Sequence, residues 1–403
     1  MDPADLAWVL VSAALVLFMT PGLAIFYGGM VRTSSVLNML LMNMYCLGIV
    51  PLVWVVVGYS LASGGEGENS LIGDFDLAFL DTITTADGLA VMAFLMTFAV
   101  ITPALISGAV ADRMKFSAWA IFVPVWSLIV YSPVVYWIYA PEGWIRNLPA
   151  LDFAGGTAIH INAGVAALAA VLVLGRRVGW PSVPMPPHNL PLTLLGAGIL
   201  WFGWFGFNAG SALGANYAAA QAFVNTFLAA AAAMIAWMIV ERVRNGHFTT
   251  LGAASGIVAG LVAMTPCAGF VAGVASIPIG AAAGVACYFA IQLKFRFGYD
   301  DSLDVVGIHM VGGIVGGVLL GFFADPSNYV AQGMAEFPEG VFFGGGADLL
   351  LDQILSIVVV LAYSFVVTGL IMLVLQKTMG VRVDAETERA GIDEGLHVEA
   401  AYS

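Results

Sequence analysis

The segment GGTAIHINAGVAALAAVLVLGRR, residues 155–177, decides the class of fold. Residues 155–174 contain no acidic or basic side chain apart from one histidine, His160, and two arginines follow directly at 176 and 177. A helix that crosses a bilayer needs about 20 predominantly apolar residues. The segment therefore predicts a transmembrane helix that carries a histidine inside the membrane.

The composition of the whole chain agrees with this segment. Of the 403 residues, 61% are hydrophobic and 10% are charged, whereas soluble domains average about 45–50% and 25%. This composition excludes a soluble enzyme and predicts that most of the protein lies in a lipid bilayer. The net charge of −13 argues against nucleic acid as a partner. The three cysteines are scattered and form no CxxC pattern, so they indicate neither a disulfide framework nor a metal site.

Hydropathy predicts an all-α polytopic membrane protein with eleven transmembrane helices. Twelve of the 13 basic residues, all except Arg146, fall in alternate connections between the apolar segments. By the positive-inside rule, this distribution places the N-terminus outside and the C-terminus in the cytoplasm, in a multi-pass protein of the cytoplasmic (inner) membrane. The predicted segments are 6–31, 36–61, 88–111, 117–139, 153–174, 190–212, 218–240, 249–266, 271–293, 305–323 and 349–375.

An odd number of segments divides naturally into an inverted five-plus-five repeat and a final helix, which is a common architecture in transporters. Within that scheme, His160 in the fifth segment and His309 in the tenth occupy equivalent places. The predicted parts are a first half (1–174), a second half (190–323), an eleventh helix (349–375) and a cytoplasmic regulatory tail (376–403).

The two histidines stand in glycine-rich surroundings, GGTAIHINAG (155–164) and GIHMVGG (307–313). Histidine inside a bilayer is costly and usually faces a pathway or a bundle interior. A purely structural role is the alternative, since a hydrogen bond between membrane helices contributes about 0.6 kcal/mol on average. Ligation of a metal or haem is a further alternative, but the apolar segments offer no other histidine, cysteine or carboxylate placed to complete a zinc or iron shell. We therefore expect a functional pair and no cofactor.

Aromatic residues supply the second indication of function. Phe98 and Phe207 lie in apolar segments near Ser211, and rings beside a polar group suit a small cation through cation–π contacts of about 2 kcal/mol or more once desolvated. The alternative is a belt of aromatic residues at the membrane interface. A belt accounts well for Trp137, Tyr139 and Trp144 but less well for phenylalanine, which lacks a polar handle.

Several separated stretches together resemble one family, the Amt/Mep/Rh ammonium transporters, and specifically its Amt branch. The resemblance covers nearly the whole chain and implies an ammonium transporter, not an enzyme, built as a homotrimer of eleven-helix protomers, each with its own narrow apolar pore. The stretches are TPGLAIFYGGMVR (20–32), TFAVITPALISGAVADRM (97–114), LDFAGGTAIHINAG (151–164), GWFGFNAGSA (203–212), LGAASGIVAGLVAMTPCAGFV (251–271) and DVVGIHMVGGIVG (304–316).

The resemblance also assigns roles to single residues. His160 and His309 match the paired pore histidines, which would line the conduction path and could relay a proton. Phe98 and Phe207 match the stacked rings that close the outer mouth. Ser211 matches the serine of the outer recruitment site, and the aspartate at the start of the fifth helix corresponds to Asp152, for which the residue pattern alone indicates an N-cap.

The chain departs from the family pattern at the mouth and in the tail. Tyr139 stands where most members have a tryptophan that completes the recruitment site, with Trp137 and Trp144 as alternative candidates, and Leu95 stands where a glutamine is frequent. The tail resembles the family's regulatory C-terminus, with Val398 at a common glycine position, and implies a PII-class signal protein as a partner.

These roles lead to one expected function and one rival. We expect ammonium to be captured outside the two phenylalanines, to lose its proton near the mouth and to cross as ammonia beside the histidines. The rival is an ammonium sensor with the same fold that binds ammonium but transports little, a hypothesis that the altered mouth supports.

Overall fold

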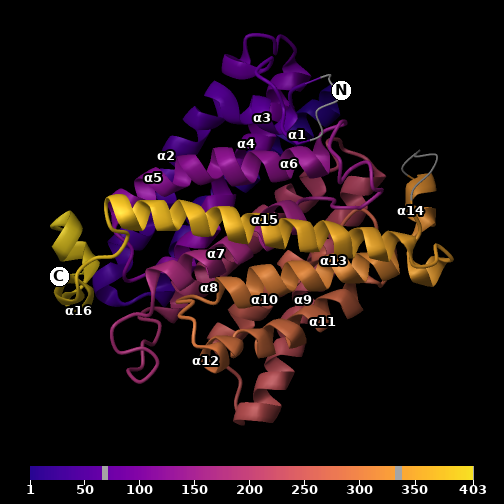
Figure 1. Ribbon diagram of the computed structural model, residues 1–403. Coiled ribbons are helices and arrows are strands. Elements are labelled where there is room, and N and C mark those ends of the chain that lie inside the picture. The colour runs from indigo at the N-terminus through magenta and orange to yellow at the C-terminus, as the bar shows by residue number, and fades with distance from the viewer. Residues whose placement is uncertain (66–70, 332–337, 403) are drawn as a thin grey trace.

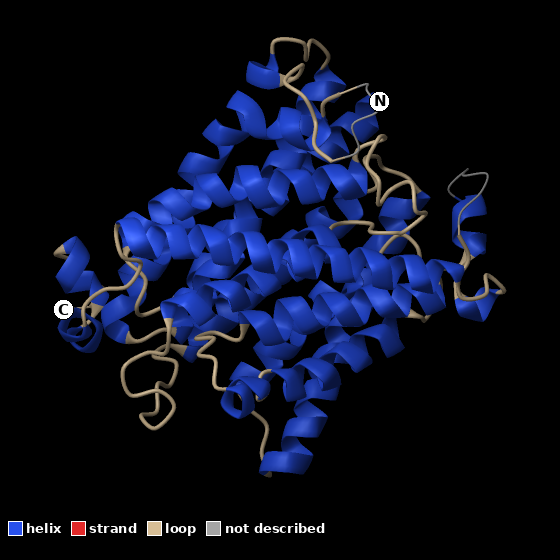
Figure 2. Cartoon of the chain, in the orientation of Figure 1, coloured by secondary structure: helices blue, strands red, loops and turns tan. Residues whose placement is uncertain are grey.

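The computed structural model describes residues 1–65, 71–331 and 338–402, and in these residues the regular secondary structure is helical apart from one isolated β-bridge between Met114 and Arg382. Long helices run side by side across the molecule, and their connections gather at its two ends (Figures 1 and 2). The N-terminus lies at one end of this bundle and the C-terminus at the other (Figure 1).

The described residues contain a helical stretch at each of the eleven predicted positions. Ten stretches are long and apolar enough to cross a membrane, and α10 is shorter. In chain order, with η for short 3₁₀ or π turns, they are α1 (Pro3–Met30), α2–η2–α3 (Val36–Val53, Trp54–Gly58, Tyr59–Ser63), α4 (Ala86–Val110), α5–η4–α6 (Phe116–Trp126, Ser127–Tyr131, Ser132–Tyr139), η5–α7 (Gly156–Ile161, Asn162–Leu174), α8–η6 (Leu190–Trp204, Phe205–Ala209), α9 (Tyr217–Asn245), α10 (Thr250–Met264), α11–α12 (Ser276–Ala290, Leu293–Phe297), η7–α13 (Val306–Met310, Val311–Phe323) and α15 (Asp348–Thr378).

Short helical elements lie in the connections and in the tail. They are η1 (Thr33–Ser35), η3 (Ala78–Leu80), α14 (Pro326–Ala331), η8 (Val341–Phe343), α16 (Ala385–Ala390) and η9 (Asp393–His397).

Two boundaries differ from the predicted ones by five residues. Helix α9 continues past residue 240 to Asn245, where Gly246 ends it with a φ of 82°. Hydropathy stops earlier because Glu241 is charged, but its carboxylate accepts hydrogen bonds from the backbone and hydroxyl of Thr249 and is satisfied there. Helix α11 begins at Ser276 instead of 271, because turns follow Pro266 up to that residue.

Small residues bring the helices of the second half close together. A Cβ added to Gly280 would lie 2.3 Å from the carbonyl oxygen of Ala229, and one added to Gly284 would lie 2.4 Å from that of Ala233. Helices α9 and α11 therefore touch backbone to backbone. Such contact is how membrane helices gain van der Waals packing, because lipid gives no hydrophobic drive for their association.

Contacts between the halves follow the expected repeat. Helix α1 packs along α8, while α7 contacts η7 and α13 contacts η5. These are the first and sixth, and the fifth and tenth, of the predicted segments. The crossing of the last pair brings the two histidine-bearing turns together in the middle of the bundle.

A buried ion network ties the connections at the C-terminal end of α7. Arg177 Nη2 donates to Asp300 Oδ1 at 2.8 Å and its Nη1 to Asp112 Oδ2 at 3.3 Å, and both aspartates are almost fully buried. Burial alone would raise the pKa of Asp300, but the Arg177 hydrogen bond and the charges of Arg113 and Arg177 outweigh burial and lower that pKa.

The C-terminal segment folds back onto the same end of the bundle. Lys115 N donates to Val381 O at 2.9 Å, and Val383 N donates to Arg113 O at 3.0 Å. The buried Glu388 carboxylate accepts from Val178 N at 2.6 Å and from Arg382 Nη2 at 2.7 Å. The tail therefore docks on several connections at once.

Candidate functional site

The two membrane histidines face each other at the crossing of η5 and η7. His160 Nδ1 and His309 Nδ1 are 3.2 Å apart and share a hydrogen bond, with the rings nearly parallel at 18° and their centroids 5.3 Å apart. Both side chains are buried. The structure thus brings the sequence-predicted pair into direct contact.

Each histidine stands in a π-helical turn whose first amides are held by an aspartate. The Asp152 carboxylate accepts from the amides of residues 155–158 at 2.6–3.0 Å. The Asp301 carboxylate accepts from Val305 N at 3.1 Å and Val306 N at 2.7 Å. A carboxylate at a helix N-terminus satisfies otherwise unpaired amides and opposes the positive end of the helix dipole. π turns occur often at functional sites because they redirect side chains.

Two glycines make the crossing feasible. Gly155 precedes the first π turn with a φ of 110°, a conformation that favours glycine. A Cβ on Gly164 would lie 2.4 Å from the backbone nitrogen of Met310. The backbones of the two histidine-bearing helices therefore meet at a distance that no side chain at residue 164 would allow.

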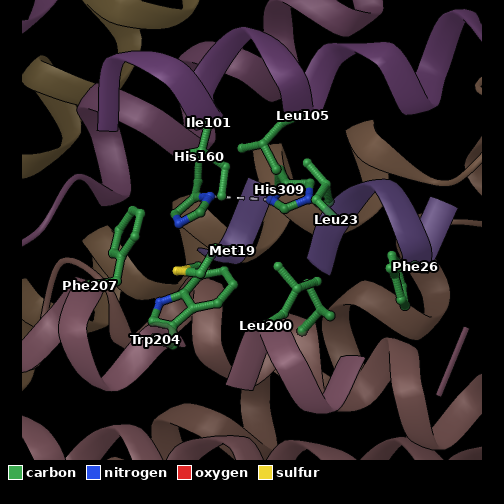
Figure 3. A pocket seen from close by; sticks show the side chains of 11 residues that line it. Met19, Leu23, Phe26, Ile101, Leu105, His160, Leu200, Trp204, Phe207 and His309 are labelled. Carbon is green, nitrogen blue, oxygen red and sulfur yellow. Dashed lines mark hydrogen bonds between the residues drawn. The ribbon is translucent and has the colours of Figure 1, made fainter. Parts of the chain in front are cut away.

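A narrow cavity adjoins the pair. The space open to the centre of a water-sized molecule is about 10 Å³, which is enough for about one such molecule. The labelled side chains of Figure 3 surround this space, and the two imidazoles supply polar groups in a lining that is otherwise mostly aliphatic and aromatic. The lining residues are Met19, Leu23, Phe26, Ile101, Leu105, His160, Leu200, Trp204, Phe207, Val258 and His309.

Phenylalanine rings close the cavity on the His160 side. The centroids of Phe98 and Phe207 are 4.2 Å apart with an interplanar angle of 34°, and Phe94 adds an edge contact to Phe98 at 4.8 Å. Phe207 in turn stacks on His160 at 5.8 Å and 27°. Phe98, Phe207, His160 and His309 thus form one continuous series of rings.

The remaining predicted residues take distinct places around this series. Ser211 Oγ donates to Phe207 O at 2.8 Å, so its side chain is held against the backbone of Phe207. Tyr139 is the last residue of α6 and half-buried, and its hydroxyl lies close to the Asp152 carboxyl group. Tyr139 and Asp152 are therefore neighbours.

The two alternative tryptophans are engaged in packing. Trp137 Nε1 donates to Leu71 O at 2.6 Å, and its ring contacts Trp144 at 5.9 Å and Tyr363 at 4.7 Å. Trp137 thus joins Leu71 and Tyr363 of α15 to the end of α6, and Trp144 packs against Trp137. Among the described residues, no group of three or more His, Cys, Asp or Glu side chains is placed to hold a metal ion.

Two residues beside His160 had no role in the sequence-based prediction. Trp204 stacks on the His160 ring at 5.3 Å and 18°, and its Nε1 donates to Thr265 Oγ1 at 3.0 Å. Thr265 Oγ1 lies 3.4 Å from His160 Nε2. Both residues lie inside stretches that carry the family resemblance, 203–212 and 251–271, and a polar threonine directly before Pro266 was the available signal.

Known proteins share this sequence and architecture. The model of the Ammonium Transporter Family matches residues 7–402. The chain is 50% identical to an ammonium transporter of Mycobacterium bovis over 431 aligned positions, which cover 100% of this chain and 90% of the relative. The crystal structure of Candida albicans Mep2 superposes with a TM-score of 0.91 at 33% identity, covering 96% of this chain and 87% of that one.

A further structure, described as a sensor Amt protein, superposes with a TM-score of 0.90 at 29% identity and covers 98% of both chains. The family match spans nearly the whole chain, and the identity to the mycobacterial transporter extends over its full length. This chain therefore belongs to the Ammonium Transporter Family.

Proposed function

We propose that the protein moves ammonium across the cytoplasmic membrane by passing ammonia through the cavity beside His160 and His309. The observation that carries this proposal is the single series of rings in which two phenylalanines in contact cover a hydrogen-bonded histidine pair next to a narrow apolar space. Membership of a family of ammonium transporters supports the substrate.

Energetics favours the neutral species in such a space. Transfer of a bare ammonium-sized ion into a low-dielectric medium costs of order 20 kcal/mol by an idealised Born estimate, and still several kcal/mol after relaxation. Removal of the proton from an amine-like group with a pKa of about 10 costs roughly 4 kcal/mol at pH 7. We infer that the proton leaves near the mouth and that ammonia enters the cavity.

Capture of the ion takes place outside the phenylalanine pair in this proposal. The Ser211 hydroxyl gives its proton to Phe207 O, so its lone pairs are left to accept an N–H of ammonium. The rings of Phe98, Phe207 and Tyr139 add cation–π attraction. Asp152 acts through its charge, because its oxygens already accept four backbone hydrogen bonds.

The histidines then provide polar contacts inside the apolar space, since a neutral imidazole accepts at one nitrogen and donates at the other. Transport carries current if the pair relays the released proton. It is electroneutral if the proton stays outside. The histidines serve the pathway in either case.

We propose that the N-terminus lies outside and that the tail from about Gln376 lies in the cytoplasm, because the basic residues concentrate on one side of the membrane.

We also propose a homotrimer. An open, shallow apolar groove of about 520 Å³ runs between α1 and α8 and is lined by Phe18, Pro191, Leu194, Leu195, Gly198, Ile199 and Phe202. Exposed backbone at Gly198 allows close approach of another helix.

A PII-class signal protein is the proposed partner of the tail. Tail docking supports this role. Glu388 is buried against Val178 in the connection after α7, and Asp393 is buried against the backbone of Leu37 and Asn38 at the start of α2. A partner that displaces the tail would thus change contacts at the connection that follows α7, which Arg177 ties to Asp300 in the connection before η7.

An ammonium sensor is the second candidate function. The likeness to a sensor Amt protein and the tyrosine at residue 139 favour it. Tyrosine is a weaker cation–π partner than tryptophan, which bears on capture at the mouth. A sensor would bind ammonium without sustained flux.

Proteoliposomes that carry a pH dye inside test the proposal, with the membrane current recorded in parallel after an ammonium pulse. We expect a saturable ammonium flux above that of protein-free vesicles. A rise in internal pH without current identifies ammonia alone, and a saturable current identifies coupled proton movement. Binding of ammonium without flux in either record would reject transport in favour of the sensor.

A further inference from the structure

Thr265 makes three contacts with one hydroxyl group beside His160. Its Oγ1 lies 2.9 Å from Leu261 O, 3.0 Å from Trp204 Nε1 and 3.4 Å from His160 Nε2. The Thr265 side chain is fully buried, so these protein atoms are its hydrogen-bond partners.

The chemistry of the three partners and their distances together assign a direction to each hydrogen bond. A carbonyl oxygen can only accept and an indole N–H can only donate, whereas a hydroxyl has one proton and two lone pairs. Leu261 O, at 2.9 Å, is a closer acceptor than His160 Nε2 at 3.4 Å, so we assign the Thr265 proton to Leu261 O, in the back-bond to residue i−4 that threonine commonly forms in helices. One lone pair accepts from Trp204. The second lone pair is what Thr265 presents to His160 Nε2.

We propose that Thr265 is a positioning residue that fixes the tautomers of the histidine pair. A lone pair facing His160 Nε2 requires a proton on that nitrogen, so Nδ1 of the neutral His160 ring is bare. His309 Nδ1, 3.2 Å away, must then carry the proton of the shared hydrogen bond. The remaining nitrogen, His309 Nε2, then carries no proton. Unlike the bare Nδ1 of His160, it has no hydrogen-bond partner in this network.

This inference rests on the proposed function and adds to it which histidine nitrogen accepts a hydrogen bond from the substrate. Ammonia donates through its N–H groups, so its acceptor in the pair is His309 Nε2. A proton that enters the pair from the substrate lands on the same atom. His309 lines the cavity next to Leu23 and Leu105 (Figure 3). His309, the histidine farther from the phenylalanine rings, is therefore the member that accepts from the substrate, while the N–H of His160 is held by Thr265.

Solid-state NMR of the full chain in lipid, with ¹⁵N-labelled histidine and no ammonium, tests the assignment. Replacement of His188, His247 and His397 by glutamine leaves only the two membrane imidazoles. We expect a protonated Nε2 and a bare Nδ1 on His160, and the reverse on His309, with a cross-peak between the two Nδ1 atoms. A protonated His160 Nδ1 in this protein would overturn the proposal.

Two variants separate the hydroxyl from the shape of the side chain. Thr265→Val keeps the branched shape and removes the hydroxyl, whereas Thr265→Ser keeps the hydroxyl. Loss of one hydrogen bond should change the tautomer ratio by roughly 3- to 10-fold in the valine variant, and serine should restore the wild-type ratio. Wild-type nitrogen shifts in Thr265→Val would overturn the role of Thr265. Because the spectra are recorded without substrate, their outcome is separate from the flux measurement that tests the proposed function.

Discussion

Asp152 and Asp301 hold the two histidine-bearing turns in the same way, each at the same interval before its histidine, 152 before 160 and 301 before 309. They do so from opposite ends of α7. Asp152 lies before the N-terminal end of α7. Asp301 lies near the other end of α7, because its neighbour Asp300 accepts a hydrogen bond from Arg177, just after the last residue of that helix. The inverted arrangement expected for the two halves thus extends to the groups that fix the histidines.

Removal of the Asp152 carboxylate should destabilise the protein. Asp152→Ala leaves four amides of η5 without their acceptor, and we expect a loss of about 2 kcal/mol, as for strong helix caps and charge-assisted hydrogen bonds. Thermal unfolding in detergent measures it, with the exposed Asp81→Ala as control. Equal unfolding temperatures for the two variants would contradict the role of Asp152 as a cap.

The phenylalanine pair should control what enters the cavity. Phe207→Ala removes a ring that contacts both Phe98 and His160, so we expect water and hydrated cations to reach the histidines and the ammonium flux to lose selectivity over potassium. Phe207→Leu keeps an apolar side chain of similar bulk and should retain most of the selectivity. Competition of potassium with ammonium in proteoliposomes measures both, and unchanged selectivity in Phe207→Ala would argue against a gate.

The buried ion network should make a pH-dependent contribution to stability. Because the folded-state pKa of Asp300 is lowered, its contribution is present above the unfolded pKa of about 3.9 and is lost as the pH falls through the folded value. Asp300→Asn should therefore cost about 3 kcal/mol between pH 5 and 8, as expected for a broken buried pair. Unfolding measured at several pH values should show this difference shrinking below about pH 4, and a constant difference at all pH values would contradict it.

Docking of the tail should depend on Glu388 and not on its exposed neighbour Glu386. Glu388→Ala removes the acceptor of Val178 N and Arg382, so we expect trypsin to cleave at Arg382 and Arg389 several-fold faster. Limited proteolysis in detergent followed by mass spectrometry measures the rate. Glu386→Ala is the matched control, and equal cleavage of the two variants would show that Glu388 does not hold the tail.

The sequence was sufficient for the helices and for the histidine pair, because both rest on strong physical signals. Long apolar runs have few alternatives to membrane helices, and two histidines in equivalent segments stand out from an apolar background. Segment ends were less predictable. Glu241 lies in a helix although hydropathy excludes it, because only the fold shows that Thr249 satisfies its carboxylate.

Residues that act by orientation were beyond the reach of sequence patterns. Thr265 and Trp204 are an ordinary small polar residue and an ordinary aromatic until the fold places them against His160. The match between Asp301 and Asp152 also depends on geometry, since Asp301 is one of several acidic residues in its connection. The residues that the tail contacts are distant from it in sequence, so only the tertiary structure shows these contacts.

The ammonium flux of His160→Ala and His309→Ala beside wild type tests the central claim most directly. Proteoliposomes of equal protein content receive an ammonium pulse while current and internal pH are recorded, with His247→Ala, an exposed histidine outside the cavity, as control. The account predicts that each membrane-histidine variant loses saturable flux or its selectivity for ammonium, while His247→Ala retains both. Wild-type flux and selectivity in both membrane-histidine variants would contradict it.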